Sequence, residues 1–321
     1  MLSQRERFRS WIPHGFDFLN PAETRIQLDL KEQVRQKFQA AGYQEIVPPM
    51  FDFARTFSLT ARGAAQNPVF QVQAGEGERL AVRSDLTVQV VKAVANRRLK
   101  QEFPARYSYI QPVFQDRPWG SGSSREILQA GVELVGEAGP ARFDEILSLA
   151  RECLAACGGR PRILYGDVRF LEHLFQMIPE RARADLSLAF HNKDTGRIQR
   201  ISEEAGLATD LSRILIEVPL TFGGAEAMAR LKELCAGQPP LLEILNEAAQ
   251  RTDVIFDFSL VRELSYYTGP VFEAYIDDSN ETVFTGGVYD DLYGEFTDDR
   301  QPACGFALNL STLVEQRAAE A

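Results

Sequence analysis

Residues 106–136 read RYSYIQPVFQDRPWGSGSSREILQAGVELVG, and this stretch decides the fold class. Its two ends, 106–115 and 127–136, alternate apolar and polar side chains well enough to predict a β-strand at each end. The segment between them is a loop rich in glycine, serine and charged residues. Two strands joined in this way form an antiparallel pair, because parallel strands need a longer crossover that is usually helical. The stretch therefore favours an α+β fold over a doubly wound one.

The segments on either side of this hairpin predict further helices and strands. Residues 20–42 carry the clearest helix pattern, in which Asn20 can cap the helix, Pro21 suits its first turn and apolar residues recur every four positions. Further helices are predicted at 85–100 and 141–156, further strands at 69–73, 79–83, 161–167, 253–260, 262–276 and 282–296, and a strand or turn passing into a helix at 304–319. This order of elements indicates an antiparallel sheet flanked by helices.

Residues 168–250 differ from the rest of the chain. They are rich in leucine, alanine, glutamate and arginine and contain few β-branched runs, which predicts several short helices. We interpret this stretch as a helical insertion of roughly 80 residues. The chain, residues 1–321, is then one core domain that this insertion interrupts.

Bulk properties exclude several classes of function. The net charge of -10 disfavours a protein whose main task is to hold nucleic acid, since that task needs a basic face. The chain has neither a signal-peptide pattern nor an apolar run of about 18 residues, so we expect a soluble, cytoplasmic protein. Cys153 and Cys157 fall four apart in a predicted helix, which is typical of buried structural cysteines. The histidines lack metal-ligand spacing, so no metal site is predicted.

Two glycine-containing segments each have two interpretations. GSGSS at 120–124 lacks the Gly-Lys-Ser/Thr ending of a phosphate-binding loop, which favours a flexible hairpin loop. TGGVYDD at 285–291 fits a strand bulge that lets a ligand approach the backbone, and it fits a tight turn equally well. The residues alone do not decide the second case.

Polar side chains within the predicted strands are the strongest candidates for a site. Gln129 and Glu133 are four apart in one strand, so they share a face with Gly131 between them. The small residue leaves space for a ligand over the sheet. Arg262 could instead form a structural ion pair with Glu133, because a buried charge is costly unless it is paired. A structural pair and a small-molecule pocket both remain open.

Four more polar residues complete this candidate set. Asp85 and Thr87 follow the strand predicted at 79–83, and Tyr266 and Tyr267 lie in the stretch RELSYYTGPVFEAYI. Acids in such a pocket would suit the ammonium group of a small ligand.

Several segments in chain order carry a resemblance to a known family. They are GFDFLNPAETRIQ, AGYQEIVPPMFD, RSDLT, RYSYIQPVFQDRP with QAGVELVG, RELSYYTGPVFE, and GGVYDDLYGEF with ACGFALNLSTLV. Together they resemble the catalytic core of histidyl-tRNA synthetase, a class II synthetase, over nearly the whole chain. The resemblance implies a class II α+β fold with an antiparallel sheet flanked by helices. It also implies homodimerisation through AGYQEIVPPMFD, which is similar to motif 1 of that class.

The chain departs from this family at two arginines that hold the phosphates of ATP. Gln115 stands where motif 2 has the arginine for the α-phosphate, and Thr312 stands where motif 3 has the arginine for the γ-phosphate. Neither residue supplies charge or a bidentate fork. Adenylate formation requires stabilisation of charge on phosphate, so we expect a degenerate ATP site and no catalytic residues. Because the chain ends shortly after this motif, we also expect no anticodon-binding domain.

The amino-acid side of the pocket matches the family better. The residues at positions that the resemblance associates with histidine recognition are Asp85, Thr87, Gln129, Glu133, Arg262, Tyr266 and Tyr267. A chain with a histidine pocket next to an ATP site that lacks both arginines resembles the regulatory subunits of ATP phosphoribosyltransferase. That family consists of synthetase paralogues that lack aminoacylation activity.

This second resemblance implies a non-catalytic subunit of an enzyme complex. The implied partner is the short catalytic subunit of ATP phosphoribosyltransferase, which performs the first step of histidine biosynthesis, and the implied assembly is a hetero-octamer built on a homodimer core. Histidine is the implied effector, and no cofactor, nucleic acid or membrane is expected. Two alternatives stay open, a divergent ligase that activates histidine and a synthetase-like factor that binds nucleic acid.

Overall fold

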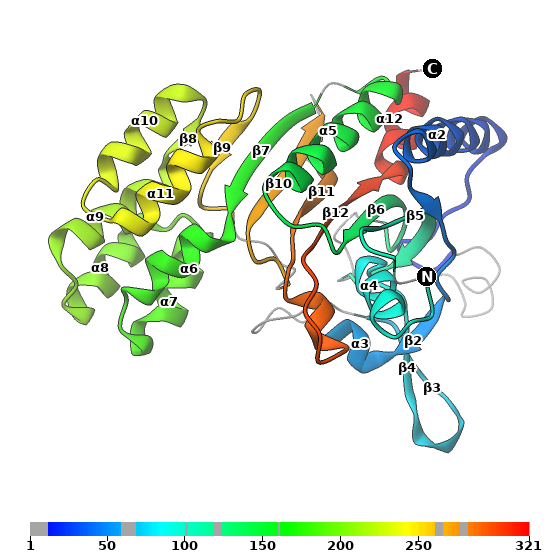
Figure 1. Cartoon of the computed structure of the whole chain (residues 1–321), viewed down its shortest axis with the longest axis horizontal. Helices are drawn as coiled ribbons and strands as arrows, with labels where there is room; N and C mark the ends of the chain where they lie inside the picture. The colour runs from blue at the N-terminus through cyan, green and yellow to red at the C-terminus, as the bar shows by residue number, and fades with distance from the viewer. Residues whose placement is uncertain are drawn as a thin grey trace, which may run out of the picture. The chain divides into compact units, whose positions relative to one another are not determined.

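The computed structural model describes residues 12–58, 69–99, 102–117, 124–159, 161–260, 266–276 and 282–320. The chain divides into two compact units, here named the first and the second unit. The first unit comprises residues 1–159, 263–266 and 291–321, and the second comprises residues 160–262 and 267–290. The chain therefore passes from the first unit into the second twice. Figure 1 labels the helices and strands of both units.

The main sheet of the first unit contains the hairpin predicted from residues 106–136. Its strands follow the order β1 (Gln44–Glu45), β5 (Ala105–Phe114), β6 (Glu126–Val135) and β12 (Ala303–Asn309). β5, β6 and β12 pair antiparallel, whereas the short β1 pairs parallel with β5. The predicted antiparallel pair is thus confirmed, and its register sets Tyr109 directly opposite Gly131.

Three helices pack on one face of this sheet. They are α2 (Pro21–Ala40), α5 (Ala141–Ala156) and α12 (Leu310–Glu320), which Figure 1 shows together. The predicted helix start is confirmed, because the Asn20 side chain accepts hydrogen bonds from two backbone amides and the Glu23 side chain accepts one from the Asn20 amide. Phe38 of α2 meets Phe306 of β12 edge to face, with 5.9 Å between ring centroids. Each such buried side chain contributes roughly 1.5–3 kcal/mol to stability.

The remaining elements of the first unit are smaller, and one of them, the helix that begins at Thr87, packs against β6 on the opposite face of the sheet. They are β2 (Phe51–Phe53), α3 (Ala54–Ser58), β3 (Gln71–Gln73), η1 (Gly75–Gly77), β4 (Arg79–Val82), α4 (Thr87–Ala95) and η3 (Leu292–Glu295). β2, β4 and β3 form a separate antiparallel sheet, which confirms the hairpin predicted after residue 69. Side chains alternate along β6, so Val132 lies on the α2 face and Glu133 on the α4 face.

The second unit contains strands in the order β11 (Thr282–Val288), β10 (Pro270–Ile276), β7 (Pro161–Asp167), β9 (Ile255–Asp257) and β8 (Phe222–Gly223). β10 pairs antiparallel with both β7 and β11, and β9 pairs parallel with β7. The sheets of both units are therefore mixed, with long antiparallel ladders and short parallel pairs.

The glycines of TGGVYDD form neither of the two structures predicted for them. Gly286 and Gly287 lie inside β11 and pair in regular register with β10, so there is no bulge or tight turn at this point. A Cβ atom at Gly287 would lie 2.9 Å from ring carbons of Tyr267 and 2.7 Å from the Pro270 carbonyl oxygen. Close packing of a tyrosine ring therefore explains why position 287 is a glycine.

Residues 168–250 form short helices, as their composition predicts. The helices are α6 (Val168–Gln176), α7 (Glu180–His191), α8 (Thr195–Ala205), α9 (Thr209–Glu217), η2 (Val218–Leu220), α10 (Ala225–Leu234) and α11 (Pro239–Ala248). All of these helices belong to the second unit, and Figure 1 draws them in green to yellow. Their interpretation as an insertion into a synthetase-like core stays a prediction.

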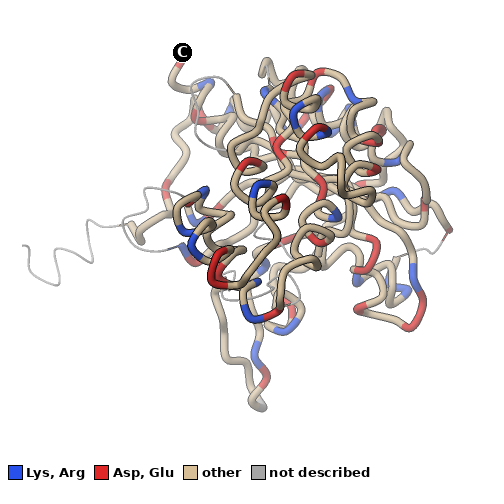
Figure 2. Tube along the Cα trace, turned by 90° about the vertical axis from the view of Figure 1, so that its left-hand side faces the viewer, with Lys and Arg blue, Asp and Glu red and all other residues tan. Residues whose placement is uncertain are grey.

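Acidic and basic residues interleave along the chain, as Figure 2 shows. Arg35 of α2, for example, pairs with Glu32 and Glu45, and Arg230 of α10 pairs with Glu217 and Glu233. Such exposed pairs contribute at most about 1 kcal/mol each. All four cysteines are buried and free, which confirms the prediction for Cys153 and Cys157. Over the described ranges, no helix has both the length and the apolar character needed to cross a membrane.

Candidate functional site

The side chain of Glu133 is the centre of a buried polar cluster in the first unit. β6 presents it on the α4 face, where its exposed fraction is 0%. Its Oε1 accepts a hydrogen bond from Thr87 Oγ1 at 2.7 Å and another from the Tyr109 hydroxyl at 3.1 Å. A buried carboxyl group is costly unless such donors satisfy it. Thr87 opens α4, so the start of this helix is tied to the middle of the sheet.

Asp85 lies beside this cluster, just before the start of α4. Its Oδ1 accepts the Val88 amide at 3.3 Å, and its Oδ2 accepts the Tyr266 hydroxyl at 3.1 Å. Val88 lies in the first turn of α4, where backbone amides have no partner within the helix. Burial raises the pKa of Asp85, and the hydrogen bonds from Val88 and Tyr266 oppose that rise.

Tyr109 belongs to the same cluster, although no sequence pattern singled it out. Burial raises the pKa of its phenol well above the ordinary value, and the carboxyl groups of Glu133 and Asp85 raise it further. The phenol therefore stays protonated and acts as a donor. Its hydroxyl occupies the place where a side chain at Gly131 would lie. The space that Gly131 leaves over the sheet is thus filled by Tyr109, so the prediction that it is kept for a ligand is wrong.

The structure brings together most of the predicted site residues of the first unit. Asp85, Thr87, Glu133 and Tyr266 form the cluster described above. Gln129 lies on the same face of β6, half-buried, opposite Gln111 of β5 and Asn309 of β12.

The remaining two predicted site residues are Tyr267 and Arg262. Tyr267 belongs to the second unit, where its buried ring packs against Tyr289 with 6.2 Å between centroids. Arg262 falls outside the described residues, and so does the ion pair with Glu133 that was one reading of the sequence. GSGSS also falls outside them, apart from Ser124.

Arg83 has a structural role that its sequence context did not reveal. Its guanidinium donates to the carbonyl oxygens of Pro48 at 2.8 Å and Pro112 at 2.6 Å, and to Gln111 Oε1 at 3.2 Å. The side chain is buried, and this burial lowers its pKa. Arg83 therefore fixes the end of β4 against β5, and with it the backbone that carries Asp85.

The guanidinium of Arg117 lies beside Gln115, the first of the two residues at which the sequence predicts a departure from the synthetases. Gln115 Oε1 accepts bonds from Arg117 Nε at 3.0 Å and from Arg117 Nη2 at 2.8 Å. Arg125 donates in turn to the Arg117 carbonyl at 3.0 Å and pairs with Asp116 at 3.3 Å. Gln115 supplies no charge of its own, but it holds the guanidinium of Arg117.

Thr312, the second of these predicted departures, lies in the first turn of α12 and is buried. Its amide donates to Asn309 Oδ1 at 3.2 Å, so Asn309 caps the helix. The neighbouring Ser311 accepts the Leu128 amide at 2.9 Å through its hydroxyl. Residues 309–312 therefore close the junction between β12 and α12.

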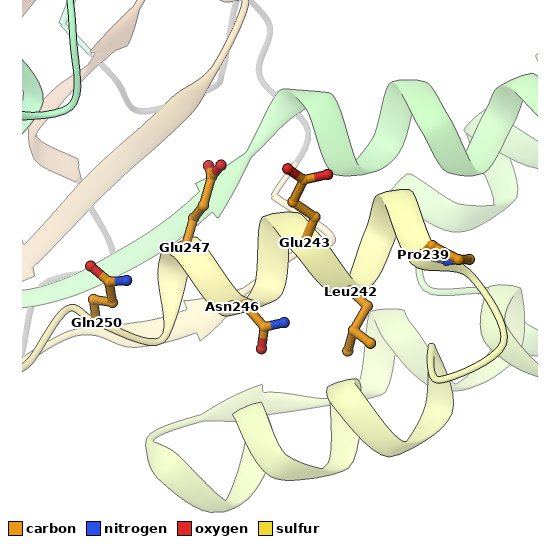
Figure 3. A pocket seen from close by; sticks show the side chains of 6 residues that line it. All are labelled: Pro239, Leu242, Glu243, Asn246, Glu247 and Gln250. Atoms are coloured by element: carbon orange, nitrogen blue, oxygen red, sulfur yellow. The ribbon is translucent and has the colours of Figure 1, made fainter.

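A shallow hollow of about 400 Å³ lies along α11 in the second unit. Figure 3 shows its lining side chains, which are Pro239, Leu242, Glu243, Asn246, Glu247 and Gln250. None of them belongs to the predicted site. Among the described side chains, no three His, Cys, Asp or Glu residues are grouped so that they could hold a metal ion.

Comparison with known proteins identifies the family. The family model of histidyl-tRNA synthetase matches residues 15–313 of the chain. The ATP phosphoribosyltransferase regulatory subunit of Leptospira interrogans is 32% identical to it, over 95% of this chain and 93% of that protein. The chain belongs to this histidyl-tRNA synthetase-like family of regulatory subunits.

Solved structures of the family share the fold. An ATP phosphoribosyltransferase regulatory subunit/histidyl-tRNA synthetase from Bacillus halodurans C superposes with a TM-score of 0.80 at 25% identity, covering 95% of this chain and 83% of that one. Histidyl-tRNA synthetase from Nostoc sp. PCC 7120 superposes with a TM-score of 0.76 at 22% identity, covering 97% and 76%, and shows the fold alone. The predicted class II synthetase-like α+β fold is confirmed.

Proposed function

We propose that this chain is the non-catalytic regulatory subunit of ATP phosphoribosyltransferase and acts in histidine biosynthesis. The observation that carries the proposal is its 32% identity, over 95% of its length, to a relative that bears this name. The two uncharged residues at the ATP side support it, because Gln115 and Thr312 cannot supply the charge that adenylate formation needs.

In this proposal the chain binds the short catalytic subunit and raises its activity. Histidine binds near Asp85, Gln129 and Glu133, which meet its ammonium or imidazole group, and its binding lowers that activity. A coupling free energy of ~1–3 kcal/mol between the two sites is sufficient for such feedback. Both proteins would meet in the cytoplasm, where a complex of this kind would work.

Co-purification with the short catalytic subunit tests the regulatory role. The catalytic subunit is assayed alone, with this chain, and with this chain plus histidine. We expect the first addition to raise the rate and histidine to lower it. An unchanged rate on addition of this chain, at concentrations where the two proteins co-elute, would overturn the regulatory assignment.

Calorimetry tests the histidine site separately. We expect the Glu133→Gln variant to bind histidine more weakly than the wild type, because the buried carboxyl group is the centre of the cluster. Glu243→Gln provides a matched control, since Glu243 is exposed on α11 in the second unit. Equal affinity of the Glu133→Gln variant and the wild type would remove the pocket from the proposal and leave the subunit role in place.

A histidine-activating ligase is the second candidate function. The observation in its favour is the Arg117 guanidinium beside Gln115, which sets one cation near the position of the missing arginine. ATP–pyrophosphate exchange in the presence of histidine separates the two functions. The regulatory proposal expects no exchange, and exchange that depends on histidine would support the ligase.

Exposed apolar side chains support the homodimer core of the proposed hetero-octamer. Val47, Met50 and Phe51 are 73%, 46% and 46% exposed, and Phe53 is 38% exposed. These residues lie within and directly after the segment that resembles motif 1. Clustered apolar exposure of this kind is typical of interaction surfaces.

A further inference from the structure

Helix α4 is short and rich in valine, so its position depends on its packing partners. It has nine residues, of which four are valines, and all four valines are buried. β-branched side chains lower helix propensity, and an isolated helix of fewer than about 12 residues is marginal in water. The position of α4 in the first unit is therefore decided by the contacts that it makes along its length.

The first turn of α4 is bonded to the buried acid cluster. The Thr87 hydroxyl donates to Glu133 at 2.7 Å, and the Val88 amide donates to Asp85 at 3.3 Å. Both acceptors are buried carboxyl groups. A change in the position of either carboxyl group therefore acts directly on the start of the helix.

The rest of α4 is bonded to the segment of residues 47–56. Gln89 Nε2 donates to the Pro49 carbonyl oxygen at 3.1 Å. Lys92 Nζ donates to Asp52 Oδ1 at 2.5 Å and to Thr56 Oγ1 at 3.1 Å, and Thr56 donates in turn to Asp52 at 3.2 Å. Lys92 therefore attaches both β2 and α3 to the second half of α4.

This attachment reaches exposed side chains. Phe53 is 38% exposed, and its ring centroid lies 5.4 Å from Lys92 Nζ and 5.1 Å from Arg55 Cζ. Attraction between these cations and the ring adds to the ion pair with Asp52. Lys92 thus holds both the backbone and an exposed aromatic ring of a segment that also carries the exposed residues Val47 and Met50.

We propose that α4 couples the buried acid cluster to the exposed apolar side chains of residues 47–53, and that Lys92 is the positioning residue at the second end of this coupling. The helix rises roughly 8 Å between Thr87 and Lys92, so one rigid element spans both sets of contacts. Such a coupling is reciprocal, because whatever binds at one end changes binding at the other by the same factor. The effectors, histidine at the cluster and a second copy of the chain at the surface, rest on the proposed function.

Hydrogen–deuterium exchange of the full chain, read by mass spectrometry over residues 51–58, tests the coupling. We expect histidine to slow exchange of this segment about fivefold in the wild type and by less than about twofold in Lys92→Met. Lys92→Arg keeps a cation for Asp52 and should restore most of the effect. Helices α10 and α11 of the second unit are the reference segment, where no change is expected.

Lys37→Met provides the matched control, because Lys37 also pairs with a carboxylate of the first unit, Glu152, at 3.7 Å. We expect this variant to keep the full effect of histidine. If Lys92 had a structural role only, Lys92→Met would speed exchange of residues 51–58 and leave the effect of histidine intact. That result would overturn the proposal.

A measurement without histidine separates this proposal from the proposed function. Glu133→Gln alters the cluster from the sheet, and Thr87→Val alters it from the helix. We expect each substitution to speed exchange of residues 51–58 in the ligand-free chain, and to have little effect when it is combined with Lys92→Met. If these substitutions act and histidine does not, the coupling is supported and the histidine assignment is refuted. If neither the substitutions nor histidine changes exchange of residues 51–58, the coupling is refuted.

Discussion

The close contact over Gly131 gives a sharp prediction for the Gly131→Ala variant. A Cβ atom at this position would overlap the Tyr109 hydroxyl and would lie 2.5 Å from both Tyr109 Cζ and the Phe306 carbonyl oxygen. Ordinary contacts of this kind begin at 3.4 Å, so the neighbours would have to move by about 1 Å. Neither can do so freely. Phe306 is held in the β6–β12 ladder, and Tyr109 is hydrogen-bonded to Glu133.

The cost of Gly131→Ala follows from these two constraints. Overpacking of a close-packed site costs about 1–3 kcal/mol. If Tyr109 moves away, its bond to Glu133 is lost as well, at about 1 kcal/mol. We therefore expect the free energy of unfolding to fall by about 3 kcal/mol, together with weaker histidine binding.

Urea unfolding followed by circular dichroism measures this loss. Gly237→Ala is the matched control, because a Cβ atom at Gly237 would meet nothing within 4 Å. Adding Tyr109→Phe to Gly131→Ala removes the overlap with the hydroxyl and leaves the overlaps with the ring carbon Cζ and the Phe306 carbonyl, so we expect partial recovery. A Gly131→Ala protein within about 0.5 kcal/mol of the wild type would refute the close-packing argument.

Two further predictions concern the buried acid and the exposed apolar surface. Burial raises the pKa of Asp85 above the ordinary 3.8, so its contribution favours folding below that pH and is lost as the pH rises through the folded-state value. Asp85→Asn should therefore increase the free energy of unfolding at neutral pH, and this gain should shrink towards pH 3.8. A gain that does not depend on pH would contradict this account. Light scattering of the Val47→Asp/Phe51→Asp variant should give a mass near 36.0 kDa and the wild type twice that value. Leu188→Asp, which alters an exposed leucine of the second unit, serves as its control, and a double variant that stays dimeric would exclude this surface as the interface.

The sequence predicted the elements whose signals come from residues close together along the chain. The helix from Pro21 was readable because its capping box and its apolar repeat are both local signals. The pair β5–β6 was readable because alternation at both ends and a polar loop between them leave few other structures. Fold class and the confirmed α+β architecture follow from such elements, since their order along the chain restricts how they can pair.

The site was less predictable because it depends on strand register. Tyr107 and Tyr109 lie on the same face of β5, and only the pairing of β5 with β6 shows that Tyr109 reaches both Gly131 and Glu133. The sequence suggested that Gly131 made room for a ligand, although it makes room for a tyrosine. The prediction for Gly286 and Gly287 was wrong for the same reason. A glycine in a strand pattern fits a turn, a bulge or a close contact, and the sequence does not distinguish them.

The hydrogen bonds of the cluster favour a sensor over a catalyst. Glu133 and Asp85 already accept hydrogen bonds from side chains and amides of the chain. The net binding free energy of a ligand cation is therefore only the difference between its own contacts and the hydrogen bonds that it replaces. Activation of an amino acid would also need preorganised charge at phosphate, yet Arg117 uses two N–H groups on Gln115 and Thr312 is buried in a helix start. A regulator needs only a difference in affinity between two states, which modest binding can supply. We therefore propose that this arrangement serves feedback and does not form an adenylate.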